Sequence, residues 1–405
     1  MRKTNHCLSI LSGMFLQCTK MGRVLAAWII LFMMVSCNGW GPKMDQASIS
    51  PYPLPPAPKL SSTEYNRLHL LCNAWYDSIL NNNAFNGAIL VAKDGNIVFE
   101  KYKGTRHVGG TDTIDANTSF HIASVSKTFT AMAVLRLVQE KKISLDDIFA
   151  KYFPAFNYPG VTIRTLLNHR SGLPNYVYFM EKVGWDPKKF VANQDILDVL
   201  VNKKNELEDI TQPGTHFTYC NTNYALLALL IEKVSNLSYP AYMKKYVFDP
   251  LQMTHSFVYT KADSSRTIPS YDWKGGIIPS NYLDEVYGDK NIYSTPSDML
   301  QWDRLLHTDL FLSADLLKEA YRPYSNERPG IRNYGLGWRM NVYPNGKKII
   351  YHNGWWHGSN ASFIRIIQND ATIIVLGNRF NRNIYKTKLL VPAFDNDLTA
   401  APDEE

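Results

Sequence analysis

The chain has 405 residues, of which 45% are hydrophobic and 20% charged. This composition supports a sizeable folded core and excludes a disordered or fibrous protein. The formal net charge of +7 comes from 43 basic and 36 acidic residues. Four of the basic residues lie in the first 36 positions, which leaves a small and scattered excess elsewhere and argues against nucleic acid as a partner.

The N-terminus carries an unbroken apolar run at residues 24–35. Twelve helical residues span only about 18 Å, too short to cross a bilayer, so the pattern predicts a secretory signal peptide over residues 1–36. Residues 34–37 (Met-Val-Ser-Cys) resemble a bacterial lipobox, which predicts that Cys37 is lipidated and anchors the protein to a membrane of the bacterial cell envelope. Ordinary cleavage and an uncleaved anchor remain alternatives.

Residues 37–60 are expected to form a Pro-rich tether. The run PYPLPPAP at residues 51–58 has five prolines in eight positions, which favours a semi-rigid polyproline spacer. Beyond Cys37 the chain contains only Cys72 and Cys220, and the sequence leaves open whether these two thiols pair.

One folded domain is expected over residues 61–395, followed by a flexible tail at 396–405. Near its start, two β-rich runs flank Asp94-Gly95, a strong hairpin signal. Helical patterns follow from Ser124 and from Asn223, and three β-rich runs close the chain, at residues 347–352, 361–368 and 371–378. The order predicts an α/β (α+β) fold in which both chain ends form one antiparallel sheet, flanked by helices, with an all-helical insertion lobe.

Ser124 and Lys127 form the first chemical candidate. Three residues apart on one helix, a serine hydroxyl and a lysine amine share a face and can meet. Burial would favour the neutral amine, which could then take the hydroxyl proton and make the serine a nucleophile. The string Ser-x-x-Lys alone is a weak signal, because a chain of ordinary composition contains it roughly once or twice by chance.

Two downstream strings strengthen this interpretation by their order. Tyr219 and Asn221 form a Tyr-x-Asn string just before an apolar helix, where the phenol could relay a proton and the amide could hold a substrate. Similar strings at residues 324–326 and 343–345 lie in turns, and we interpret them as loops. His352-Asn353-Gly354 lies on a late β-rich run that could line the same pocket.

With these motifs the chain resembles the serine β-lactamase and penicillin-binding protein family, most closely class C-like hydrolases, D,D-peptidases and esterases. The resemblance covers roughly residues 60–390. It also includes five longer stretches, which are FHIASVSKTFTAMAV (120–134), TLLNHRSGLP (165–174), IYSTPSDM (292–299), YGLGW (334–338) and HNGWWHG (352–358).

The resemblance implies an acyl-enzyme hydrolase without a metal or cofactor. It implies Ser124 as the nucleophile, Lys127 as the general base, Tyr219 as the proton relay and Asn221 as a substrate-positioning amide. The backbone N–H groups of Ser124 and Trp355 would form the oxyanion hole. His352, Asn353 and Gly354 would bind substrate, with His352 where β-lactamases usually carry the lysine of Lys-Thr-Gly.

This departure bears on the substrate, because histidine is mostly neutral at pH 7 and attracts a β-lactam carboxylate less than lysine does. We therefore expect an exported hydrolase of a D-amino-acid peptide or small ester. The alternatives are a true β-lactamase and a surface lipoprotein that binds penicillin or peptide without turnover. Trp355 and Trp356 could narrow the acyl site, form a stacking wall or simply pack. The oligomeric state is left open.

Overall fold

The computed structural model describes residues 50–398. The predicted signal peptide, the lipidation site at Cys37, the first part of the tether and the end of the tail lie outside the described residues, and those expectations stay predictions. In the described part of the chain, no helix is both long and apolar enough to span a membrane. Cys72 and Cys220 are both buried free thiols, so the pairing that the sequence left open does not form.

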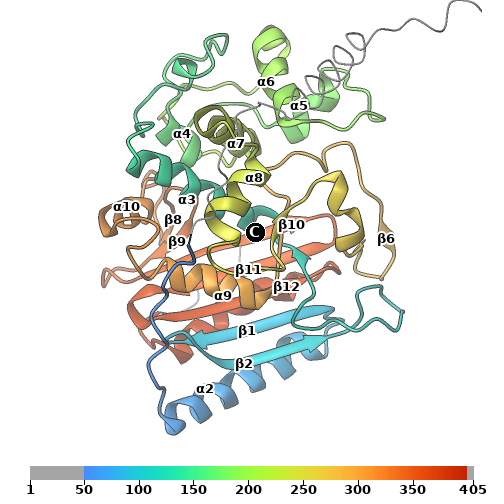
Figure 1. Ribbon diagram of the computed structural model, residues 1–405, viewed down its shortest axis with the longest axis vertical. Coiled ribbons are helices and arrows are strands. Elements are labelled where there is room, and N and C mark those ends of the chain that lie inside the picture. Colours follow the sequence, from blue (N-terminus) through green and yellow to red (C-terminus); the bar gives the residue numbers. More distant parts are fainter. Residues whose placement is uncertain (1–49, 399–405) are drawn as a thin grey trace, which may run out of the picture. The chain divides into compact units, whose positions relative to one another are not determined.

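A seven-stranded antiparallel sheet, in the order β2-β1-β12-β11-β10-β9-β8, forms the centre of the domain. Its strands, from both ends of the domain, are β1 (Gly87–Lys93), β2 (Asn96–Lys103), β8 (Arg332–Tyr334), β9 (Arg339–Val342), β10 (Lys348–Trp356), β11 (Ser359–Ile366) and β12 (Ala371–Gly377). The predicted hairpin turns at Asp94-Gly95, where both residues have the positive φ of a two-residue hairpin turn. β1 then pairs with the last strand, β12, as the fold prediction required (Figure 1).

Each face of this sheet has its own apolar core. Along β12, Ile373 and Val375 belong to one buried cluster, whereas Ile374 and Leu376 belong to the other, which is the period of two expected for a sheet covered on both faces. The cover on the first face consists of helix α2 (Ser62–Trp75) and the 3₁₀ helix η8 (Arg382–Ala393). The cover on the second consists of α3 (Ser126–Gln139) and α9 (Pro296–Leu305). Neither α2 nor η8 was predicted from the sequence.

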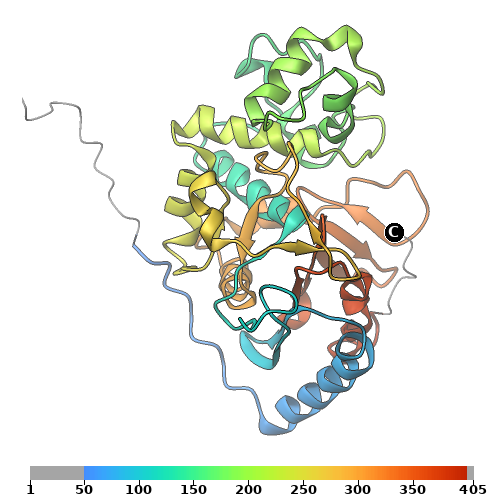
Figure 2. The same ribbon diagram turned by 90° about the vertical axis from the view of Figure 1, so that its right-hand side faces the viewer.

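The helical insertion lies between β2 and β8 and projects from one end of the sheet, away from α2 (Figures 1 and 2). Its helices are α4 (Ile163–Leu167), α5 (Tyr176–Lys182), α6 (Asn193–Asn202), α7 (Asn221–Ser235) and α8 (Tyr239–Met243). Helix α7 is buried along most of its length, as its apolar sequence predicts, and Asn236 ends it in the left-handed conformation. The same stretch of chain also holds α10 (Ala314–Ala320) and two small sheets.

The small sheets add strands that the sequence analysis did not assign. They are β3 (Phe120–His121), β4 (Phe257–Val258), β5 (Ser270–Tyr271), β6 (Ile277–Ile278) and β7 (Ile292–Ser294). β3 precedes the Ser124 segment directly and pairs with β7, so two short strands hold the start of α3 in place.

The Pro-rich run is extended and lies along the folded domain rather than away from it. The Tyr52 N–H donates to the Pro250 carbonyl at 3.0 Å, and its phenol accepts from Arg136 at 2.6 Å. Arg304 donates to the Pro55 carbonyl at 2.6 Å. Extended proline-rich backbone leaves its carbonyls unpaired, and here side chains of the domain supply the donors.

Candidate active site

Ser124 and Lys127 lie next to each other at the start of α3. Ser124 belongs to a short 3₁₀ turn, η2 (Ala123–Val125), and the α-helix begins two residues later, so the two residues do not share one α-helix as expected. Lys127 is fully buried, and its Nζ donates to Ser124 Oγ at 3.0 Å and to the Asp289 carbonyl at 2.8 Å. The hydrogen bond to the Asp289 carbonyl holds the Lys127 amine next to the Ser124 hydroxyl.

The phenol ring of Tyr219 covers the same amine. Lys127 Nζ lies 5.0 Å from the Tyr219 ring centroid and 5.7 Å from that of Tyr224. Tyr219 in turn packs on His169, with ring centroids 4.4 Å apart, and the N–H of Cys220 donates to His169 Nδ1 at 3.1 Å. Burial, with a smaller effect of the Lys127 charge, lowers the pKa of His169 well below its ordinary value. A neutral imidazole therefore supports the tyrosine.

Strand β10 passes directly beside the serine. A Cβ on Gly354 would lie 2.3 Å from the Ile122 carbonyl oxygen and 3.1 Å from the Ser124 nitrogen, so only glycine allows this approach. β9 pairs with β10 no further than Tyr351. From His352 onward β10 is therefore a free edge on that side, with Asn353, Gly354 and Trp355 in the wall of the cavity.

The cavity in front of Ser124 measures about 1020 Å³, which suits a small-molecule or peptide substrate. It brings together six of the eight residues that we predicted for catalysis or binding in the folded domain. These are Ser124, Tyr219, Asn221, Asn353, Gly354 and Trp355. Lys127 does not line the cavity, but it contacts the hydroxyl of Ser124, which does.

His352 is, besides Lys127, the second predicted site residue that does not line the cavity. It is fully buried, and its Nδ1–H donates to the Asn353 carbonyl at 2.7 Å while Nε2 lies 3.2 Å from the Tyr334 hydroxyl. Burial, followed by the nearby Arg339 charge, lowers the pKa of His352 well below its ordinary value. The imidazole is thus neutral at pH 7, as expected, whereas its contact with substrate stays a prediction.

The two tryptophans of this strand have different surroundings. Trp355 is 64% exposed and forms part of the cavity wall, with its indole N–H donating to the His357 carbonyl at 2.7 Å. Trp356 also lines the cavity but is partly buried, and its indole N–H donates to Asp284 at 2.7 Å. Both tryptophans therefore belong to the cavity wall, and Trp356 is in addition packed and hydrogen-bonded.

Arg339 is a feature of the cavity that the sequence analysis missed. It lies in the cavity wall at the start of β9, with its guanidinium 5.1 Å from the centroid of the Tyr219 ring. The available signal was its position directly after the YGLGW run. Since arginine stays protonated in proteins, it supplies the permanent positive charge that His352 does not.

A second missed group lies behind Lys127. Tyr176 donates to Asp289 Oδ2 at 2.8 Å, and Lys290 donates to the same phenol. All three side chains are buried, and the burial of Lys290 lowers its pKa. This network fixes the position of Asp289, whose carbonyl oxygen holds Lys127.

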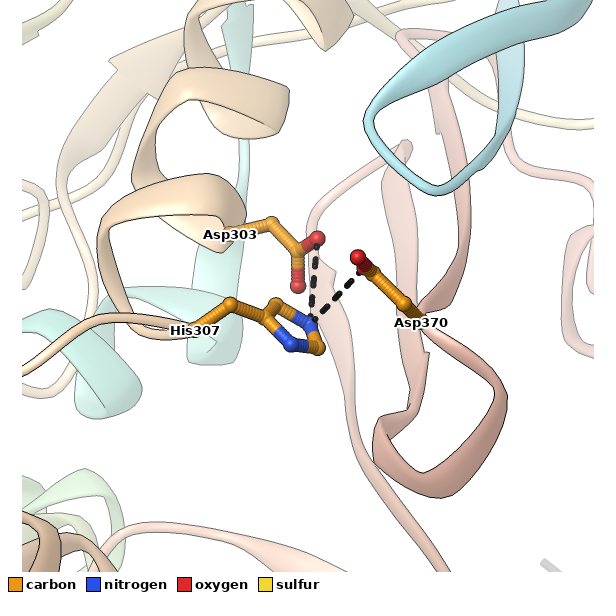
Figure 3. Close-up of side chains that lie close together, drawn as sticks. All are labelled: Asp303, His307 and Asp370. Atoms are coloured by element: carbon orange, nitrogen blue, oxygen red, sulfur yellow. Dashed lines mark ion pairs between the residues drawn. The ribbon is translucent and has the colours of Figure 1, made fainter. Parts of the chain in front are cut away.

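One cluster among the described residues has ligand types that can bind a metal ion. Figure 3 shows the imidazole of His307 beside the carboxylates of Asp303 and Asp370, with Nε2 3.7 Å from Asp303 Oδ2 and 3.4 Å from Asp370 Oδ1. Both oxygens of Asp303 already have donors, from the Arg365 guanidinium and the Thr372 hydroxyl. The Arg365 guanidinium therefore already supplies the positive charge beside Asp303. We interpret the cluster as an ionic link between α9 and the sheet.

Comparison with known proteins gives consistent matches. The model of the beta-lactamase family matches residues 76–389. Penicillin-binding protein 4* of Bacillus subtilis (strain 168) is 32% identical over 334 residues, which cover 78% of this chain and 73% of that protein. Protein flp of Staphylococcus aureus (strain MW2) is 28% identical over 318 residues, which cover 72% of this chain and 59% of flp.

Two solved structures share the fold. The penicillin binding protein from Bacillus halodurans superposes with a TM-score of 0.68 at 23% identity, over 80% of this chain and 98% of that one. The octameric penicillin-binding protein homologue from Pyrococcus abyssi superposes with a TM-score of 0.66 at 24% identity, over 80% of this chain and 77% of that one.

Proposed function

This chain belongs to the beta-lactamase family, and from that premise we propose that it is a serine hydrolase that forms an acyl-enzyme on an amide or ester substrate. The observation that carries the proposal is the 3.0 Å contact between Lys127 Nζ and Ser124 Oγ at the base of a 1020 Å³ cavity. A buried amine in hydrogen-bond contact with a serine hydroxyl is the geometry that base-assisted nucleophilic catalysis needs.

In the proposed reaction, Lys127 takes the proton of Ser124 as Oγ attacks the substrate carbonyl carbon. The N–H groups of Ser124 and Trp355 stabilise the oxyanion, which the close approach of Gly354 to Ser124 supports. Collapse breaks the bond to the leaving group, which receives a proton by way of Tyr219. This proton is the one that Lys127 took from Ser124. Water then attacks the acyl-enzyme and gives a proton to the neutral Lys127, which returns it to Ser124 Oγ as the acyl–oxygen bond breaks and the acid leaves.

The cavity wall contains one arginine, Arg339, and one carboxylate, Asp209, and the arginine beside Tyr219 favours a substrate with a carboxylate near the scissile bond. His352 is neutral, whereas Arg339 places a permanent charge beside Tyr219. A D-amino-acid peptide or a related ester carries such a carboxylate on its leaving group, and we propose this class. Penicillin-binding protein 4* of Bacillus subtilis is named for binding penicillin, an amide with a nearby carboxylate, and this supports the proposed class.

The test uses a fluorophosphonate and a labelled penicillin on the purified domain, followed by a panel of p-nitrophenyl esters, D-alanyl peptides and a chromogenic cephalosporin. We expect wild type to be labelled and Ser124→Ala to remain unlabelled with its fold intact. We also expect turnover of the peptides or esters. Fast cephalosporin turnover would instead identify a β-lactamase, and labelling without any turnover would identify a binding protein.

We also propose that the protein is exported and anchored through a lipid on Cys37, on the sequence pattern alone. Cells that express the full chain should incorporate radiolabelled palmitate, and Cys37→Ser should abolish the incorporation. The Cys7→Ser variant is the matched control, because Cys7 lies in the predicted signal peptide and should leave incorporation intact. An unlabelled wild-type protein would overturn the anchor.

A further inference from the structure

A second cavity has Tyr219 in its wall but not Ser124. It measures about 730 Å³, within the usual range for a ligand site. Thr218, Tyr219 and Arg339 line both cavities, so the two spaces meet at the same wall.

The described residues that line this second cavity carry an excess of positive charge. Its basic residues are Arg328, Arg332, Arg339 and Lys388, and Glu327 is its single carboxylate. Glu327 accepts from Arg170 at 2.9 and 3.0 Å and from the Phe217 N–H at 2.7 Å. Glu327 is thus paired with an arginine outside the lining, and the other charged residues of the lining are all basic, a composition that favours an anion.

Lys388 supplies a buried cationic group to the wall of this second cavity. Its side chain comes from η8, on the other face of the sheet, and is only 7% exposed. The Nζ atom lies 4.4 Å from the Tyr351 ring centroid and 3.4 Å from its hydroxyl. A buried ammonium loses hydration, which an anionic ligand in the adjacent cavity would compensate.

The position of the second cavity indicates which part of the substrate it would bind. In the proposed reaction Tyr219 protonates the leaving group, so the leaving atom must lie beside Tyr219. The acyl part then occupies the cavity that contains Ser124. The remainder of the leaving group would then extend past Tyr219 and Arg339, which line both cavities, toward the second, basic cavity.

We propose that the leaving group of the natural substrate carries at least two anionic groups, one at Arg339 and another in the second cavity, held by Arg328, Arg332 and Lys388. This inference rests on the proposed function and names its substrate class. The anionic groups are carboxylates or phosphates, since both accept hydrogen bonds from arginine in the same geometry.

The kinetic test compares peptides that share one acyl part and differ only in the last residue. These residues are D-Gln, D-Glu and O-phospho-D-Ser. We expect kcat/KM for the better of the two doubly anionic peptides to exceed that for D-Gln by about tenfold, the usual size of one charge-assisted hydrogen bond. A higher kcat/KM for the D-Glu peptide identifies carboxylate as the preferred group, and a higher kcat/KM for the O-phospho-D-Ser peptide identifies phosphate. Equal rates for all three peptides would overturn the proposal.

Variants assign the effect to the cavity. The double variant Arg328→Gln/Arg332→Gln should bring the ratio of anionic to D-Gln peptide close to one. Arg322→Gln is the matched control, because Arg322 is exposed and lines neither cavity, and it should keep the wild-type ratio. An unchanged ratio in the double variant would show that the preference arises elsewhere.

A binding measurement separates this inference from the reaction itself. Ser124→Ala protein is titrated by calorimetry with N-acetyl-D-glutamate, N-acetyl-O-phospho-D-serine and N-acetyl-D-glutamine. Tighter binding of a doubly anionic compound, lost in the double arginine variant, supports the cavity even if no peptide is hydrolysed. Equal binding of all three compounds overturns it even if Ser124 proves to be the nucleophile.

Discussion

Gly354→Ala tests the closest approach in the active site. The added Cβ would lie 2.3 Å from the Ile122 carbonyl oxygen, whereas ordinary contact begins at 3.4 Å, so β10 must move away from the Ser124 segment by about 1 Å. The movement would separate the N–H groups of Ser124 and Trp355. A misplacement of about 1 Å, or the loss of one oxyanion donor, costs on the order of 100-fold in rate.

The assay is hydrolysis of a p-nitrophenyl ester, together with the rate of fluorophosphonate labelling. We expect kcat/KM and the labelling rate to fall at least about 100-fold, and overpacking to lower the free energy of unfolding by about 1–3 kcal/mol. Urea unfolding measures the second effect and establishes that the variant is folded under assay conditions.

The matched control is Gly87→Ala. Its Cβ would lie 2.0 Å from the Leu376 carbonyl oxygen, between β1 and β12 of the same sheet, but outside the cavity that contains Ser124. It should lose stability by a similar mechanism and keep its activity per folded molecule. A folded Gly354→Ala protein with activity within a factor of about three of wild type would refute the reasoning, because the strand would not need to lie against the serine.

Three further predictions concern the base, acid stability and a buried ion pair. Lys127→Met should abolish labelling by fluorophosphonate while circular dichroism shows a retained fold, and preserved labelling would remove Lys127 from the mechanism. Burial lowers the pKa of His121 to about 4, so the unfolded chain binds more protons between about pH 6.5 and 4. The contribution of neutral His121 to the free energy of unfolding is complete above about pH 6.5 and should decline by about 3 kcal/mol by pH 4. Urea unfolding at several pH values should show a smaller decline in His121→Gln than in wild type. Arg365→Met should lower the free energy of unfolding by about 3–5 kcal/mol, because it leaves Asp303 buried without its cation, whereas Arg322→Met at an exposed ion pair should change it by less than about 1 kcal/mol.

Local patterns were sufficient to predict much of this protein. The Asp94-Gly95 hairpin, the apolar helix α7 and the last three strands follow from turn chemistry and residue periodicity, which depend on neighbours within a few positions. The spacing of Ser124 and Lys127 likewise predicted their contact, because three residues of helical backbone bring two side chains together.

Only the tertiary structure decided what surrounds that contact. The approach of Gly354 to Ser124, the Asp289 carbonyl on Lys127 and the place of Arg339 beside Tyr219 join segments that are far apart in the chain. The burial that keeps His352 neutral also depends on how strands and lobe pack. Burial and electric field are properties of everything within several ångströms of a group, and sequence distance does not report them.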